Sequence, residues 1–70
     1  MRKHYKNLTI EAQPVLLPAS GAWGVRFKIC GAESEKTYTY PETYGNREIA
    51  VYRCFELAVR IIDAPGATPF

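Results

Sequence analysis

Apolar and polar residues alternate along three stretches of the chain, and a period of two residues predicts half-buried β-strands. We expect the strands over residues 5–13, 22–30 and 35–40. In the second strand, the side chains expected to face the core are Trp23, Val25, Phe27 and Ile29. Turns are expected around Ala19–Gly21 and over Gly31–Ser34. Pro41 is expected to end the third strand, since proline cannot donate a backbone hydrogen bond to a neighbouring strand.

The last long stretch, Asn46–Asp63, has the periodicity of a helix. Asn46 is a favourable N-cap, and Glu48 suits the positive end of the helix dipole. The charged residues crowd into one narrow arc, which holds Arg53, Glu56, Arg60 and Asp63. The apolar arc spans about 200°, whereas the apolar stripe of a surface helix needs roughly 100°. The helix therefore carries more apolar surface than one contact requires.

Together these elements predict an α+β fold. Short connections favour an antiparallel meander of three strands, and the amphipathic helix covers its apolar face. The expected architecture is a β-β-β-α two-layer sandwich. Residues 1–70 form one domain, with an ordered core over about 5–64 and a tail over 65–70.

The excess apolar surface of the helix leaves two alternatives open. In the first, the segment Pro14–Pro18 or the tail folds back over it. In the second, it stays exposed and binds a protein partner, most simply a second copy of the chain. A domain this small often needs a partner for stability, which favours the second alternative. The candidate interface residues are Leu16, Leu17, Tyr52, Phe55, Val59 and Ile62.

Composition argues against catalysis and against a cofactor. The single histidine, His4, and two distant cysteines, Cys30 and Cys54, do not make a zinc site, and both cysteines are expected to be free thiols. Convergent catalytic groups are also missing, so we do not expect an enzyme or a small-molecule substrate. The basic start is not followed by the apolar run of a signal peptide, and no segment is apolar enough to span a membrane. A cytoplasmic location is therefore expected.

The pattern also resembles a group of small bacterial β-β-β-α proteins of unknown function. They share a Tyr-Lys start, a Gly-x-Trp hairpin, an aromatic third strand and a helix ending near Ile-Asp. The matching residues are Tyr5, Lys6, Ile10, Gly21, Trp23, Tyr38, Tyr40, Tyr44, Ala50, Ile62 and Asp63. The chain departs from this pattern by an extra residue in Ser20–Trp23, and by Ile49 where an acidic residue is common. The resemblance implies the fold but no activity.

The outer face of the sheet supports a second function. A three-stranded sheet backed by a helix resembles the arm-binding domains of phage integrases and the plant ethylene-response domain, which place such a sheet in the major groove of DNA. The candidate contacts are Arg26, Lys28, Thr37 and Thr39. However, the net charge is only +2 and the isoelectric point is 8.7, and nucleic-acid-binding domains are usually more basic. We therefore favour a non-enzymatic protein-interaction module over a nucleic-acid-binding one. The module is expected to bind itself or another protein through the helix flank or through an open edge of the sheet.

Overall fold

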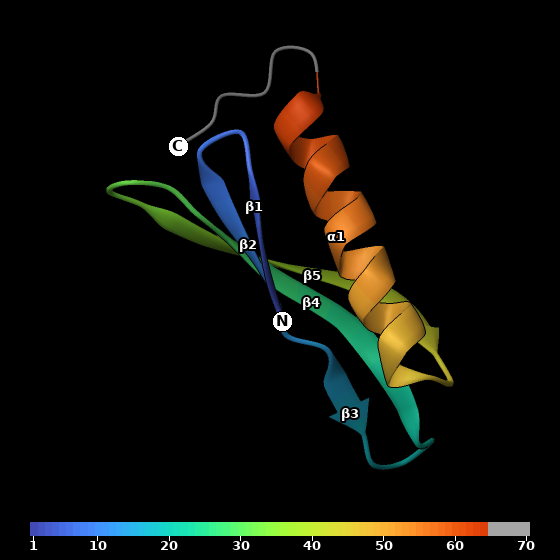
Figure 1. Cartoon of the computed structure of the whole chain (residues 1–70). Coiled ribbons are helices and arrows are strands. Elements are labelled where there is room, and N and C mark those ends of the chain that lie inside the picture. Colours follow the sequence, from blue (N-terminus) through green and yellow to red (C-terminus); the bar gives the residue numbers. More distant parts are fainter. Residues whose placement is uncertain (65–70) are drawn as a thin grey trace.

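The computed structural model describes residues 1–64 and shows an antiparallel sheet with one helix lying across one face (Figure 1). The strands are β1 (Arg2–Tyr5), β2 (Leu8–Ala12), β3 (Val15–Leu17), β4 (Ala22–Cys30) and β5 (Glu35–Tyr44). The helix is α1 (Arg47–Asp63). The α+β class and the C-terminal helix are confirmed, but the sheet has five strands where three were predicted. The tail predicted at 65–70 lies outside the described residues.

The first additional strand is β1, so regular structure begins at Arg2 rather than near Tyr5. A tight turn at Lys6 and Asn7 joins β1 to β2, and both residues have positive φ, 50° and 65°. Two-residue hairpin turns favour this conformation because it matches the twist of the strands. The register pairs Lys3 with Ile10, which places Lys3 on the face of the sheet that carries the helix.

The second additional strand is β3, which lies within the Pro14–Pro18 segment. Both β2 and β3 pair with β4, β2 with residues 27–30 and β3 with residues 22–24. Pro14 lies in the gap between them, where no backbone donor is needed. Gly21 closes the predicted turn with φ 71° and donates to the Leu17 carbonyl at 2.8 Å. The segment therefore extends the sheet and does not fold back over the helix.

Strand β5 continues through Pro41, so the prediction that Pro41 ends it is wrong. The register with β4 shifts at this point: Val25 pairs with Tyr40, but Gly24 pairs with Thr43. Two residues, Pro41 and Glu42, are extra on β5 and form a bulge. Proline is accepted in such a bulge because its missing N–H interrupts no regular ladder.

The core lies between β4 and α1. Val25, Phe27 and Ile29 are almost fully buried, as the alternation predicted, while Trp23 is half-buried. On the helix the side chains with no exposed surface are small: Ala50, Cys54 and Ala58. They allow a close approach, in which the Cys54 thiol lies 3.3 Å from the Arg26 carbonyl oxygen. The ring of Phe27 stacks against Tyr38 and Tyr40, with centroids 5.4 and 5.9 Å away.

The start of α1 confirms the predicted cap. Asn46 Oδ1 accepts hydrogen bonds from the backbone N–H groups of Glu48 and Ile49, at 2.7 and 3.4 Å. These bonds satisfy two donors that have no partner inside the helix. Within residues 1–64, no helix is long and apolar enough to cross a membrane.

The β1–β2 turn gives a test of the fold. Asn tolerates positive φ better than residues with larger or aliphatic side chains. Asn7→Ala should therefore lower the free energy of unfolding by about 1 kcal/mol, whereas Asn7→Gly should keep or raise it. Urea unfolding followed by tryptophan fluorescence measures both. An equal loss of stability in the two variants would contradict the positive φ of Asn7 in this turn.

Candidate interaction surface on helix α1

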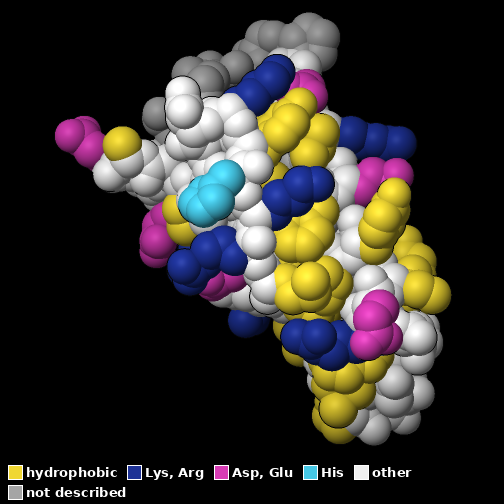
Figure 2. All heavy atoms as spheres, viewed as in Figure 1, with side chains coloured by type: hydrophobic (Ala, Val, Ile, Leu, Met, Phe, Trp, Pro, Cys, Tyr) yellow, Lys and Arg dark blue, Asp and Glu magenta, His cyan; other side chains and the backbone are white. Residues whose placement is uncertain are grey.

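The small residues of α1 face the sheet, and larger apolar residues lie along one side of the helix. We call Tyr52, Phe55 and Val59 the α1 flank. Tyr52 is 73% exposed, whereas Phe55 and Val59 are half-buried against the edge of the core. Figure 2 shows hydrophobic side chains running along the helix on this face of the molecule. Ile62, the fourth helical candidate, is also half-buried against the core.

Two adjoining grooves border the α1 flank. One has a volume of about 330 Å³ and is lined by Lys3, Tyr52, Phe55, Glu56, Val59 and Arg60. The other has a volume of about 210 Å³ and is lined by Met1, Arg47, Glu48, Val51, Tyr52 and Phe55. Because both include Tyr52 and Phe55, they form one strip along the helix. Lys3 on β1 lies against the first groove, and Met1 against the second.

The tip of the β1–β2 hairpin is held to the end of α1. The Tyr5 hydroxyl donates to Asp63 Oδ2 at 2.6 Å, and the Lys6 ammonium donates to Asp63 Oδ1 at 2.6 Å. Lys6, and then Tyr5, lower the pKa of Asp63, and the same contacts raise the pKa of Lys6. This three-residue contact keeps β1 beside the helix.

Charged residues of both signs lie at each end of the α1 flank. Lys3 and Arg60 line the groove nearer the C-terminal end of α1, and Glu48 lines the groove at the N-terminal end. Within residues 1–64, none of the three forms an ion pair. Glu56 differs, because it pairs with Arg53, which also contacts Glu42 at 2.6 Å. The charged residues at the C-terminal end of the flank are thus Lys3, Glu56 and Arg60, and those at its N-terminal end are Arg47 and Glu48.

The structure does not bring all six predicted interface residues together. Leu16 and Leu17 lie on β3, where they pair with Trp23 and Ala22, and neither groove of the α1 flank includes them. Leu16 is 50% exposed and makes a separate apolar spot. The prediction that they share a surface with Tyr52 is therefore not supported by the geometry.

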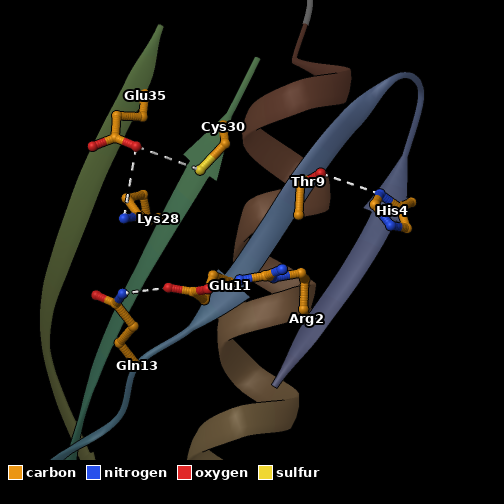
Figure 3. A network of polar contacts seen from close by, with 8 residues as sticks. All are labelled: Arg2, His4, Thr9, Glu11, Gln13, Lys28, Cys30 and Glu35. Atoms are coloured by element: carbon orange, nitrogen blue, oxygen red, sulfur yellow. Dashed lines mark hydrogen bonds and ion pairs between the residues drawn. The ribbon is translucent and has the colours of Figure 1, made fainter. Parts of the chain in front are cut away.

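The candidate nucleic-acid contacts do share one face. Arg26 is opposite Thr39, and Lys28 is opposite Thr37, on the sheet face away from α1. Acidic groups lie among them, however: Lys28 Nζ is 3.7 Å from Glu35, and the paired position on β2 is Glu11. Figure 3 shows Glu11 between Arg2 and Gln13, with contacts of 2.8 and 2.7 Å. Arg2, and then Gln13, lower the pKa of Glu11, so the carboxylate stays charged.

The outer face also has a shallow groove where Gly24 has no side chain. Its volume is about 420 Å³, and it is lined by Val15, Leu17, Gly24, Val25, Arg26, Thr39, Tyr40, Pro41 and Thr43. The lining is largely apolar, with Arg26 as the single charged group. This lining differs from the dense basic stripe of a typical nucleic-acid interface.

The histidine and the two cysteines, which were not expected to form a zinc site, are spread over the fold. His4 Nδ1 lies 3.1 Å from the Thr9 hydroxyl on the outer face. Cys30 and Cys54 are both free thiols, and burial raises the pKa of Cys54. Within residues 1–64, no three His, Cys, Asp or Glu side chains are grouped as metal ligands would be.

Comparison with protein-family models, curated proteins and solved structures found no match to this chain. The resemblance to small bacterial β-β-β-α proteins therefore remains a prediction, and the functional argument rests on the surface described above.

The sequence interpretation missed the residues that border the α1 flank from β1, and also the charges at its ends. The signal for β1 is present in the chain: Lys6 and Asn7 separate two short runs, and Asn is a frequent turn residue. Once the hairpin is recognised, alternation places Lys3 and Tyr5 on the helix face. Glu48 was seen only as a helix-dipole residue, and Arg60 only as part of the polar arc.

The contact between Asp63 and the hairpin predicts a pH dependence. Because the folded protein lowers the pKa of Asp63, its contribution to stability is present above the ordinary pKa of about 4 and is lost as pH falls through the lowered value. Asp63→Asn should remove this contribution, so the drop in melting temperature between pH 6 and pH 2.5 should become smaller. Glu33→Gln, a change in a turn, is the control. If Asp63→Asn leaves the drop in melting temperature unchanged, the contact between Asp63 and the hairpin is contradicted.

Proposed function

We propose that this chain is a non-enzymatic protein-interaction module and that it binds through the α1 flank. The observation that carries the proposal is the apolar strip formed by the exposed Tyr52 and the half-buried Phe55 and Val59, beside two grooves in the folded domain. Clustered apolar surface bordered by polar residues is typical of protein-binding sites. Tyr52 also has the character of an interface residue, with a large rigid ring and a polar hydroxyl.

The helix flank is a better contact than the β1 edge of the sheet; β5, which pairs only with β4, forms another edge. The edge strand β1 carries Arg2, Lys3 and His4, and Lys3 lies on its helix face. Charged residues on an edge strand, especially inward-facing lysines, oppose pairing with another strand. The charges of β1 therefore favour a partner that packs on α1 over one that extends the sheet at β1.

Nucleic-acid binding by the outer face is the less supported alternative. Arg26 is exposed and forms no ion pair within the described chain. The other basic groups on this face have carboxylate neighbours, Lys28 with Glu35 and Arg2 with Glu11. Since phosphate contacts supply most of the affinity for nucleic acid, one unpaired arginine supports only weak binding.

Site-specific photocrosslinking tests the interaction module. A benzophenone amino acid replaces Tyr52, which is exposed enough for the fold to tolerate it, and adducts formed in expressing cells are identified by mass spectrometry. We expect a discrete protein adduct, and the purified partner should then bind the unmodified chain with an affinity that Tyr52→Ser weakens at least threefold.

The matched control places the same photocrosslinker at Thr39, which is exposed on the opposite face of the sheet. A partner that uses the α1 flank gives an adduct at position 52 and none at position 39. Adducts at neither position, or at position 39 alone, would overturn the proposal.

A salt titration tests the alternative. If the outer face binds duplex DNA, Arg26→Ala should reduce the slope of log K against log salt concentration by about 0.9, the value for one phosphate contact. Fluorescence anisotropy at 20–200 mM salt measures the slope. An absence of wild-type binding at the lowest salt concentration would exclude this function, and Arg47→Ala is the charge-matched control.

A further inference from the structure

We propose that the groove on the outer face of the sheet is a binding site for a small monocarboxylic acid with an aliphatic chain. The groove has a volume of about 420 Å³ and is lined by residues of β3, β4 and β5. It lies on the opposite face from the α1 flank, so this site is independent of the proposed function. The inference is carried by the difference between the two ends of the groove, the guanidinium of Arg26 and the side chain of Leu17.

The floor of the groove is Gly24. This residue pairs with Val15 on β3 and with Thr43 on β5, so the row has side chains at its two sides and none in the middle. In the described part of the chain, an added Cβ at Gly24 would meet only the Val15 carbonyl oxygen within 4 Å, at 3.7 Å, apart from its chain neighbours. A glycine in a strand often marks a place where a ligand approaches the backbone closely.

One wall of the groove is held in place by the bulge in β5. Pro41 lines the groove, while the next residue, Glu42, contacts the helix. Glu42 Oε1 accepts a hydrogen bond from Arg53 Nε at 2.6 Å and another from the Tyr44 hydroxyl at 2.9 Å. These contacts fix the bulge, so the wall is already formed before a ligand binds and little ordering is required.

Arg26 is the single charged residue of the lining. It is exposed and forms no ion pair within residues 1–64. The carboxylates nearby on this face already have partners: Figure 3 shows Glu11 beside Arg2, and Glu35 beside Lys28. A guanidinium has five N–H donors and binds a carboxylate through two parallel hydrogen bonds. Arg26 is therefore available to hold an anion at its end of the groove.

The charge of the groove favours a carboxylate over a phosphate. One arginine without an ion pair matches a single negative charge. A phosphate group carries more charge, and helix N-termini and clusters of basic residues are its usual sites. In the described chain neither of these lines the groove, because its only other polar side chains are the hydroxyls of Thr39 and Thr43.

The other end of the groove favours an aliphatic chain. Val15 and Leu17 form the wall on β3, and Leu17 pairs with Ala22, four residues from Arg26 along β4. At about 3.3 Å per residue, the two ends are about 13 Å apart. The groove volume also falls within the range of small-molecule sites, about 300–1,000 Å³. The ligand therefore binds with its carboxylate at Arg26 and its chain extended over Gly24 toward Leu17.

Titration with sodium octanoate at pH 7, followed by ¹H–¹⁵N NMR, tests this site. Octanoate should shift the backbone amide signals of Gly24, Arg26 and Thr39 in a saturable manner, and the signals of Tyr52 and Phe55 should not move. Acetate has no aliphatic chain and 1-octanol has no charge, so each should bind about tenfold more weakly than octanoate or weaker still.

Two substitutions separate the charge from the space. Arg26→Gln, at an exposed position that the fold tolerates, should weaken octanoate binding by about tenfold. Gly24→Val fills the floor and should weaken binding by a similar factor, with a melting temperature equal to or above that of the wild type, because valine suits a strand better than glycine. Lys28→Gln is the matched control on the same face. Since Lys28 is already beside Glu35, its loss should leave the affinity within about twofold.

Four outcomes would overturn the site. The first is a dissociation constant for octanoate above about 10 mM, which is too weak for a specific site. The second is binding of 1-octanol as tight as that of octanoate, and the third is an affinity that Arg26→Gln leaves unchanged. The fourth is a set of signal shifts confined to the α1 flank, which would show that the aliphatic chain prefers that surface.

Discussion

The close contact between α1 and the central strand β4 determines most of this structure. Ala50, Cys54 and Ala58 are spaced four residues apart, so they lie on one line of the helix. Their small side chains let the helix backbone approach Val25, Phe27 and Ile29, and all three small residues are fully buried. Larger residues on this line would hold the helix away from the sheet and leave Phe27 without its cover.

The same contact explains why Tyr52 on the α1 flank is exposed. A helix that rests on small residues turns its larger ones to the sides, where Leu57 and Val51 still reach the core but Tyr52 does not. The β1–β2 hairpin covers part of one side, and Asp63 holds its tip to the helix. The hairpin borders the flank without closing over it, so the domain keeps an apolar strip that Lys3 of β1 borders on one side.

The sequence predicted the features that depend on local patterns. The alternation around Phe27 and the cap at Asn46 were enough to place the central strand, its buried face and the start of the helix. The wrong predictions involve turns and bulges, where the backbone conformation that the fold requires matters more than the usual preference of the residue. Lys6 adopts positive φ although lysine is not a typical turn residue, and Pro41 lies inside a strand because a bulge removes the need for its N–H.

Only the part of the candidate site that lies on one helix could be predicted from the sequence, because only that part follows a local pattern. Helical periodicity identified Tyr52, Phe55 and Val59 together, since they lie on one helix. No periodicity relates Lys3 to Arg60, because only the tertiary packing of β1 beside α1 brings them to one groove. Leu16 and Leu17 were misplaced because an apolar run without periodicity does not show which side of the sheet it joins.

The bulge in β5 has a consequence for how this chain tolerates changes of length. Strand side chains repeat with a period of two, so the two extra residues, Pro41 and Glu42, return Tyr44 to the same face as Tyr40. A single insertion would turn Tyr44 outward and shift the start of α1. Insertions and deletions inside this bulge should therefore be accepted in pairs.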